Sequence, residues 1–272
     1  MDEKVEQYLK RIGYLNKTLN SDLKTLEDLI LHHVTSIPFE NLNPILNLPV
    51  KIDIESVYEK IVSNLRGGYC YEQNTLFYYV LKNIGFDVKA LAGRVIWNQP
   101  KDSITTLTHM FLLITIANEE YLVDLGFGAQ TPTAPIKFLL FDEQQTPHEL
   151  YRINKLDHDF VLETFENDIW KSMYQFNKTP QQFIDFEVGN WYTSTHPDFI
   201  FTNLLFVAIA DQSTRFTLIN NKFKKNHLNG SVENKTLLSI DDFKEILTNV
   251  FKINLNNLNE LDQKLNEILQ ND

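Results

Sequence analysis

The chain has 272 residues, a formal net charge of −11 and a hydrophobic fraction of 43%. This charge argues against nucleic acid as a partner, because affinity for nucleic acid rests on clustered Lys and Arg. The single cysteine cannot form an intramolecular disulfide, and no run of 18 apolar residues predicts a membrane-spanning helix. The charged N-terminus lacks the apolar core of a signal peptide, so we predict a cytoplasmic protein without a membrane partner.

The first third of the sequence is predicted to be helical. Ser21 or Asp22 caps a helix whose apolar residues recur at three- to four-residue spacing as far as His33. A second helix follows Asp53, and its apolar stripe comprises Ile54, Val57, Ile61 and Leu65. The pair Gly67 and Gly68 ends it, and a third helix runs from Cys70 to a stop at Gly85.

The remaining sequence favours strands, followed by a mixed region. Strand-length segments occupy 86–97, 108–117 and 119–126, with a tight turn at Asn118, and three antiparallel strands follow over 152–176. Many strands joined by hairpins predict a small barrel. Mixed elements then follow: helices over 180–192, 241–253 and 256–272, and strands over 206–210 and 215–220. We therefore expect an α+β protein with a helical bundle at 1–85, a β-barrel at 86–190 and an α/β lid at 191–272.

The only thiol lies in the segment RGGYCYEQN, residues 66–74. At the start of a helix, free backbone N–H groups and the helix dipole stabilise a thiolate, and the two preceding glycines let the chain approach a substrate closely. The motifs of zinc sites, serine hydrolases and P-loops are absent from the sequence. A lone cysteine is more often a small buried hydrophobic residue, so a nucleophilic Cys70 requires a base.

His109 is the histidine best placed to be that base. It opens an apolar strand, and a hairpin turning near Asn118 brings Asp124 close to the position opposite. A buried aspartate is costly without a partner, so each of these residues accounts for the other. We predict Cys70, His109 and Asp124 as catalytic residues. We assign solvated or turn positions to the other histidines, which are His32, His33, His148, His158, His196 and His227.

Five segments resemble the arylamine N-acetyltransferase family: IPFENLN at 37–43, RGGYCYEQN at 66–74, THMFLL at 108–113, YLVDLGFG at 121–128 and NWYTSTHP at 190–197. The resemblance implies a helical bundle, a β-barrel and an α/β lid around a transglutaminase- or papain-like Cys-His-Asp core. It also implies that acetyl-CoA, as co-substrate, acetylates Cys70, and that an arylamine, arylhydrazine or N-hydroxyarylamine then takes the acetyl group. No metal is required.

The resemblance further implies roles for individual residues. Phe39 and Phe127 match positions that line an aromatic-amine pocket. Contacts with CoA are implied for Thr105, Thr106, Gly126, Gly128 and Tyr192. From the residues alone, the N–H groups of Gly126 and Gly128 could face an anion, and a turn around a packed Phe127 is an equal alternative.

Three further features bear on the site. Glu40 and Arg66 match a family pair that we interpret as structural. Asp198 stands where Ser or Thr is commoner in the family, and its carboxylate would repel CoA phosphates. The basic run of Lys222, Lys224 and Lys225 would compensate, although such a run is usually a solvated face.

Two other functions stay open. A thiol hydrolase uses the same three residue types in the same order but admits water to the acyl-enzyme. A binding protein that has kept the fold and lost turnover would also preserve these motifs.

Overall fold

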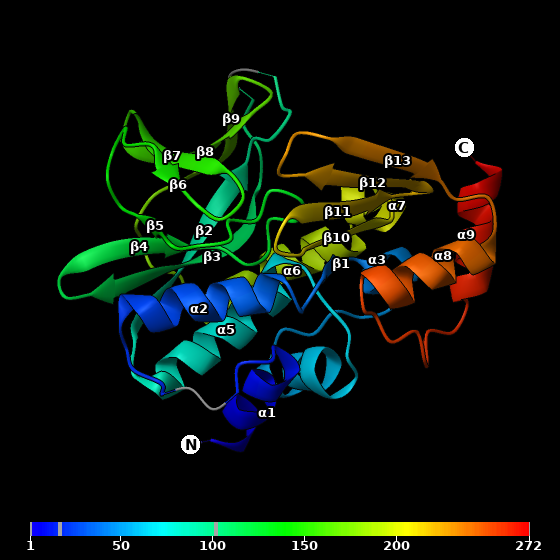
Figure 1. The fold of residues 1–272 in the computed structure, drawn as a ribbon, viewed down its shortest axis with the longest axis horizontal. Coiled ribbons are helices and arrows are strands. Elements are labelled where there is room, and N and C mark those ends of the chain that lie inside the picture. Colours follow the sequence, from blue (N-terminus) through cyan, green and yellow to red (C-terminus); the bar gives the residue numbers. More distant parts are fainter. Residues whose placement is uncertain (1, 16–17, 101–102, 272) are drawn as a thin grey trace.

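Helices from the N-terminal third pack against each other beneath the first strands of the structure (Figure 1). The computed structural model describes residues 2–15, 18–100 and 103–271. The helices in this part are α1 (Glu3–Arg11), α2 (Leu23–Val34), α3 (Leu42–Ile45), α4 (Ile54–Tyr58), the π-helix η1 (Glu59–Ser63) and α5 (Cys70–Ile84). The side chain of Asp22 caps α2, and Gly85 ends α5 with a left-handed φ of 105°. Both helix boundaries agree with the sequence prediction.

The predicted stripe of the second helix is wrong at its last residue. The helix changes from α4 to the wider turns of η1, which fit more residues into each turn and rotate later side chains around the axis. Leu65 consequently follows η1 with a φ of 50° and is 46% exposed. Val57, which precedes η1, and Ile61, which lies within it, are fully buried as expected.

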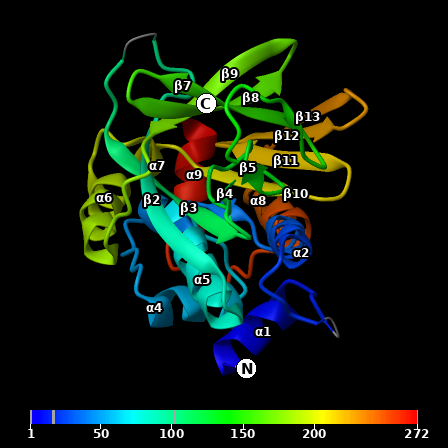
Figure 2. The ribbon, with the colours of Figure 1, turned by 90° about the vertical axis from the view of Figure 1, so that its left-hand side faces the viewer.

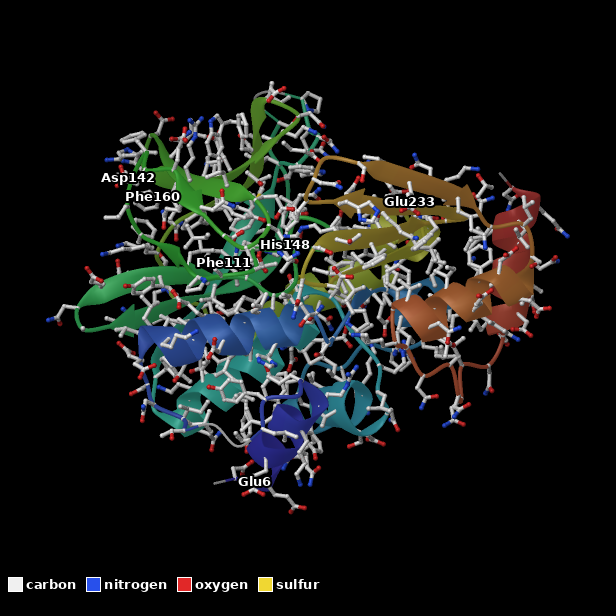
Figure 3. The ribbon with its side chains drawn as sticks, in the orientation of Figure 1. Glu6, Phe111, Asp142, His148, Phe160 and Glu233 are labelled. Atoms are coloured by element: carbon white, nitrogen blue, oxygen red, sulfur yellow. The ribbon has the colours of Figure 1, made fainter. Side chains whose placement is uncertain are left out.

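Eight antiparallel strands form a nearly closed barrel, as the hairpin pattern predicts. They are β2 (Asp87–Val95), β3 (Leu107–Ile116), β4 (Glu119–Val123), β5 (Ile136–Lys137), β6 (Gln144–Gln145), β7 (Leu150–Leu156), β8 (Asp159–Glu166) and β9 (Ile169–Phe176), in the order β5-β4-β3-β2-β9-β8-β7-β6. A bridge between Leu140 and Ile153 brings the two ends of the sheet together. Phe111 and Phe160 lie in this region in Figure 3, and Phe111 is fully buried in the barrel core.

A second sheet pairs one short strand from the N-terminal third with four strands from the C-terminal region, and Figure 2 shows the C-terminal strands side by side. Its strands are β1 (Phe39–Glu40), β10 (Phe206–Ala210), β11 (Thr214–Ile219), β12 (Lys222–His227) and β13 (Val232–Thr236), in sequential order. The accompanying helices are α6 (Phe183–Thr195), α7 (Ile200–Asn203), α8 (Ile240–Glu245), the π-helix η2 (Ile246–Val250) and α9 (Leu261–Gln270). The residues of α3 pack into the core of this C-terminal region. Residue 190, the expected boundary, falls inside α6, and Asp272 of the predicted tail helix lies outside the described residues.

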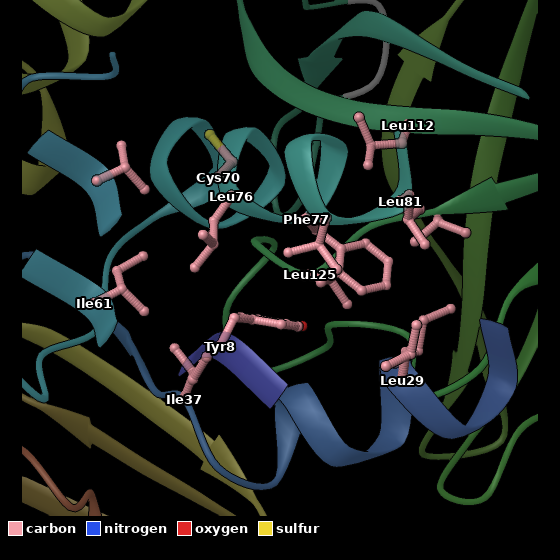
Figure 4. Packing of buried hydrophobic residues seen from close by; sticks show 14 of the residues in the cluster. Tyr8, Leu29, Ile37, Ile61, Cys70, Leu76, Phe77, Leu81, Leu112 and Leu125 are labelled. Atoms are coloured by element: carbon pink, nitrogen blue, oxygen red, sulfur yellow. The ribbon is translucent and has the colours of Figure 1, made fainter. Parts of the chain in front are cut away.

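Buried side chains of α1, α2 and α5 form the first core, which reaches β3 (Figure 4). Cys70 lies at the upper edge of this core, while Tyr8, Phe77 and Leu29 fill its interior. The start of α5 is therefore held on a packed base. None of the helices in the described residues has the length and apolar character needed to cross a membrane.

Candidate active site

Cys70 is the first residue of α5 and is only 4% exposed. Its thiol lies 3.9 Å from the carbonyl oxygen of Thr108, near the start of β3. The preceding glycines are needed for packing, since a Cβ on Gly67 would lie 2.1 Å from the Pro38 oxygen and one on Gly68 would lie 2.7 Å from Oε2 of Glu72. Their close contacts are thus with the protein itself, which differs from the expected clearance for a substrate.

Glu40 and Arg66 form the predicted ion pair beside this turn. Nη2 of Arg66 lies 2.7 Å from Oε1 of the fully buried Glu40, whose Oε2 accepts the N–H of Leu42 at 2.7 Å. Burial alone would raise the pKa of Glu40, but Arg66 and Lys60 hold it down at about 2. The pair connects the residues before Cys70 to β1, which carries Phe39.

His109 and Asp124 lie side by side. Their Nε2 and Oδ2 atoms are 2.7 Å apart, and both side chains are buried. The hairpin turns at Ala117 and Asn118, both with positive φ, and pairs Leu112 with Val123. Asp124 is therefore two residues out of register with His109, and the two side chains meet diagonally across the strands.

The carboxylate of Asp124 is held by two further groups. Its Oδ1 accepts the backbone N–H of Gly126 at 2.9 Å, and Nδ2 of Asn74 lies 3.4 Å away. Asn74 follows Cys70 by one turn on the same face of α5, the i, i+4 relationship. That spacing within RGGYCYEQN was the available sequence signal for Asn74, which the sequence analysis did not assign to the site.

Burial alone would lower the pKa of His109, but the charge of Asp124, the hydrogen bond to it and the nearby Cys70 raise it to about 10. The imidazole therefore holds a positive charge at neutral pH, next to the thiol. Aromatic side chains surround the ring: Tyr174 lies 4.7 Å away between centroids and Phe127 lies 5.5 Å away, edge-on. Tyr174 is fully buried beside Asp124 and was also missed in the sequence.

A cavity of about 590 Å³ is lined by both Cys70 and His109. Its aromatic lining consists of Phe39, Trp97, Phe127, Tyr192, Phe199, Phe201 and Phe206. The ring of Phe39 lies 5.1 Å from that of Phe206 and 5.7 Å from that of Phe201. Trp97 and the three residues Phe199, Phe201 and Phe206 lie in segments to which the sequence analysis gave no site role.

Most of the residues with an expected CoA contact also line this cavity, namely Thr105, Thr106, Gly126 and Tyr192. Gly128 lies outside the lining, and an added Cβ there would meet the ring of Phe206 at 3.0 Å. The N–H of Gly128 donates to Thr131 Oγ1 at 2.9 Å, just as the N–H of Gly126 donates to Asp124. Both N–H groups therefore have acceptors within the protein, and for Gly126 that acceptor is the carboxylate of Asp124.

Charged groups are scarce around the cavity. Among its described lining residues, only His109 and Asp198 are charged or titratable side chains besides the thiol and Tyr192. The three lysines of the expected compensating run lie on β12, outside the lining, and Lys225 pairs with Glu233 at 2.9 Å. In the described part of the chain, no group of three or more His, Cys, Asp or Glu is arranged to hold a metal ion.

Two histidines that we placed at solvated positions are buried. His33 is fully buried because it faces α1, a helix that the sequence analysis did not assign. His148 lies at the junction of the barrel with the second sheet (Figure 3), where its Nε2 is 2.8 Å from the Asp211 carbonyl. His158 is exposed as expected, whereas His227 is half-buried and lies 2.8 Å from Glu233.

Comparisons with known proteins agree with this geometry. A family profile described as N-acetyltransferase matches residues 22–260. An arylamine N-acetyltransferase of Mycolicibacterium smegmatis is 40% identical over 255 residues, 92% of each chain. An enzyme of Salmonella typhimurium, named arylamine N-acetyltransferase / N-hydroxyarylamine O-acetyltransferase, is 34% identical, covering 87% of this chain and 84% of its own. The Mycobacterium marinum arylamine N-acetyltransferase in complex with CoA superposes with a TM-score of 0.93 at 34% identity, covering 97% of this chain and 99% of its own. The chain therefore belongs to the arylamine N-acetyltransferase family.

Proposed function

We propose that this protein transfers an acetyl group from acetyl-CoA to the nitrogen of an arylamine, arylhydrazine or N-hydroxyarylamine, through an acetylated Cys70. One observation carries the proposal: His109 is hydrogen-bonded to Asp124 and lines, together with Cys70, a cavity with aromatic walls. The helices up to Gly85 supply the nucleophile, the barrel supplies His109 and Asp124, and the C-terminal region adds part of the cavity wall. A single thiol that must stay reduced suits the cytoplasm.

The first half-reaction acetylates the cysteine. In the resting enzyme the Cys70 proton already lies on His109, so the sulfur attacks the thioester carbonyl carbon of acetyl-CoA as a thiolate beside the imidazolium. Asp124 orients the imidazole and stabilises its positive charge. The backbone N–H of Cys70 is the proposed donor to the oxyanion of the tetrahedral intermediate. The bond from carbon to the CoA sulfur then breaks, and His109 returns the proton to the departing thiolate.

The second half-reaction transfers the acetyl group from Cys70 to the amine. Aromatic amines are weak bases and are therefore neutral nucleophiles at pH 7. The amine nitrogen attacks the acetyl carbon, His109 accepts the amine proton, and the bond to Cys70 breaks. Cys70 leaves as a thiolate beside the protonated His109, which restores the resting ion pair.

The cavity suits a flat aromatic acceptor. Phe39 and Phe127 lie on its wall with the rings of Phe201 and Phe206, so stacked and edge-on contacts are available to an aromatic ring. We propose Thr105, Thr106 and Tyr192 as contacts for the CoA arm, because they line the same cavity. We infer a further role for Gly126: an added Cβ would lie 2.2 Å from the Cα of Cys70, so this glycine allows the loop after Asp124 to lie against Cys70.

Acetylation of the isolated protein tests the proposal. We expect acetyl-CoA alone to add one acetyl group to the protein and release one CoA, as measured by intact mass and thiol titration. Cys70→Ala, which removes the only thiol of the chain, serves as the control. A wild-type protein that takes no acetyl group would exclude the transferase.

Turnover separates the two alternatives. An arylamine should accelerate CoA release and appear as its N-acetyl product, with hydrazines and propionyl-CoA tested in the same panel. Release of acetate that is independent of amine would identify a thiol hydrolase. A single release of CoA without turnover under any acceptor would indicate a binding protein.

A further inference from the structure

Three polar side chains from three helices form a chain of hydrogen bonds beneath the cysteine turn, residues 66–70. The hydroxyl of Tyr8 on α1 lies 2.8 Å from Nδ1 of His33 on α2, and Nε2 of His33 lies 2.8 Å from Oε1 of Gln73 on α5. Nε2 of Gln73 then donates to the carbonyl oxygen of Gly68 at 2.8 Å. We refer to these residues as the Tyr8–His33–Gln73 relay; Figure 4 shows the Tyr8 side chain within the first core.

The relay has only one consistent arrangement of protons. Because the amide nitrogen of Gln73 donates to Gly68, its oxygen faces His33 and accepts. Nε2 of His33 must therefore carry a hydrogen, and Nδ1 accepts from the Tyr8 hydroxyl. Tyr8 and His33 are fully buried and Gln73 is 1% exposed, so none of these groups has water as an alternative partner. A buried network in which every member is paired specifies one geometry.

The end of the relay holds two backbone segments together. The Gly68 carbonyl that accepts from Gln73 also accepts the N–H of Glu40 at 3.1 Å. The Gln73 amide lies 3.4 Å from the Pro38 carbonyl, which accepts the N–H of Gly68 at 3.3 Å. The contacts involve Pro38 and Glu40, which flank Phe39, and Gly68, which lies two residues before Cys70. The side chains of Phe39 and Cys70 both line the cavity.

We propose that His33 is a positioning residue for acetyl transfer: through Gln73 it fixes the carbonyls of Gly68 and Pro38, and so sets Cys70 relative to His109 and Phe39. The inference rests on the proposed function but concerns residues outside its chemistry. His33 is not among the described residues that line the cavity. A displacement of about 1 Å at a reacting atom costs on the order of a hundredfold in rate, so the position of the turn governs the rate of acetylation.

Paired substitutions on α2 test this role. His33→Leu removes the link, whereas His33→Gln keeps an N–H donor facing Gln73. The matched control is His32→Leu, because His32 is the adjacent residue and contacts the Ile12 carbonyl at 3.0 Å, away from the cysteine turn. For each variant we would measure the single-turnover rate of Cys70 acetylation at saturating acetyl-CoA, the KM for acetyl-CoA, and the melting temperature. Rates are compared well below the lowest melting temperature.

We expect His33→Leu to lower the acetylation rate by about tenfold or more with little change in KM. His33→Gln should recover the rate to within about threefold of wild type, and His32→Leu should match wild type. A folded His33→Leu protein with the wild-type rate would overturn the proposal. So would an equal loss of rate in His33→Gln, since a donor to Gln73 would then have no effect.

Two further variants test the same proposal if the His33→Leu protein does not fold. Gln73→Met keeps the side-chain length but breaks the link from its other end, and Tyr8→Phe removes a single hydroxyl. Both should lower the acetylation rate, and a wild-type rate in either folded variant would contradict the relay. If the wild-type protein takes no acetyl group, the proposed function fails. The positioning role is then decided by the rate of Cys70 alkylation by iodoacetamide in the same variants.

Discussion

Asn74 lies one helical turn after Cys70 and connects α5 to both strands of the His109–Asp124 hairpin. Its Nδ2 donates to the Met110 carbonyl at 2.8 Å, and its Oδ1 accepts the N–H of Leu125 at 3.2 Å. Met110 follows His109 and Leu125 follows Asp124 in the sequence. The residue after each of the two partners is therefore fixed by the helix that carries the thiol.

Asn74→Ala should damage both stability and activity. The substitution leaves the Met110 carbonyl and the Leu125 N–H buried without this partner, and each such loss costs about 1–3 kcal/mol. We expect a loss of about 2–4 kcal/mol in urea unfolding and a reduced acetylation rate. Asn83→Ala on the same helix is the matched control, because Asn83 is exposed and bonds only to Tyr79 on its own helix. Equal behaviour of the two variants would remove Asn74 from the site.

Asp124→Asn should nearly abolish acetyl transfer while leaving the thiol in place. The neutral amide no longer stabilises the imidazolium, and loss of an orienting carboxylate lowers kcat by about three to four orders of magnitude in comparable triads.

The pH dependence supplies a second measurement. Burial lowers the pKa of His109, and the Asp124 charge outweighs it. In Asp124→Asn the imidazolium therefore loses its proton at lower pH, and alkylation of Cys70 by iodoacetamide should be slower than in wild type between pH 6 and 7. Retention of most of the activity would show that Asp124 is a scaffold residue.

Local signals were sufficient for the helices around the thiol and for the barrel. Asp22 as a cap and Gly85 as a stop act within a few residues, and the turn at Asn118 sets the hairpin that joins His109 to Asp124. Their pairing could be predicted because a buried acid and a buried base on neighbouring strands each need a partner.

Features that depend on distant segments were not predictable from such patterns. The burial of His33 depends on the packing of α1 against α2, and β1 pairs Phe39 with Ala208, far along the chain. The change to π-helical turns in η1 cannot be read from the spacing of apolar residues along the sequence. Its effect is seen only in the folded chain, where Leu65 is exposed. The N–H groups of Gly126 and Gly128 find their acceptors only once the loop is folded.

Asp198→Asn should improve the use of acetyl-CoA. Asp198 is exposed at the cavity, where its carboxylate repels an approaching polyanion, and no Lys or Arg is present among the described lining residues. We expect the KM for acetyl-CoA to fall by about twofold to fivefold at low ionic strength, with the difference shrinking at high salt. The KM for p-nitrophenyl acetate, an uncharged donor, should not change.

A net-charge control accompanies that variant. Asp168→Asn changes the charge of the protein equally but lies at the exposed turn between β8 and β9, outside the cavity lining. The same fall in KM for both variants would assign the effect to net charge and not to the position of Asp198.

Mild acid should destabilise the protein through His33. Burial lowers its pKa to about 4, and the nearby Arg11 charge acts in the same direction, against the hydrogen bond that His33 donates to Gln73. In the unfolded chain the pKa of His33 returns to about 6.5. Between about pH 6.5 and 4, the unfolded chain therefore binds a proton that the folded chain does not bind. The stability is therefore complete above about pH 6.5 and falls as the pH drops towards 4, by roughly 3 kcal/mol in total.

The other groups with shifted pKa values differ in whether they contribute to stability in this pH window. Glu40, with a pKa near 2, loses its contribution only below its unfolded pKa of 4.5, and His109, whose pKa is raised, keeps its contribution throughout the acid range. His148 has a lowered pKa and acts in the same sense as His33. Urea unfolding at pH 7, 6 and 5 should show a steep loss in wild type and a clearly smaller one in His33→Gln, with His32→Gln as the control. An unchanged pH slope in His33→Gln would mean that another group takes up the proton on unfolding, because only His33 has lost its titration in that variant.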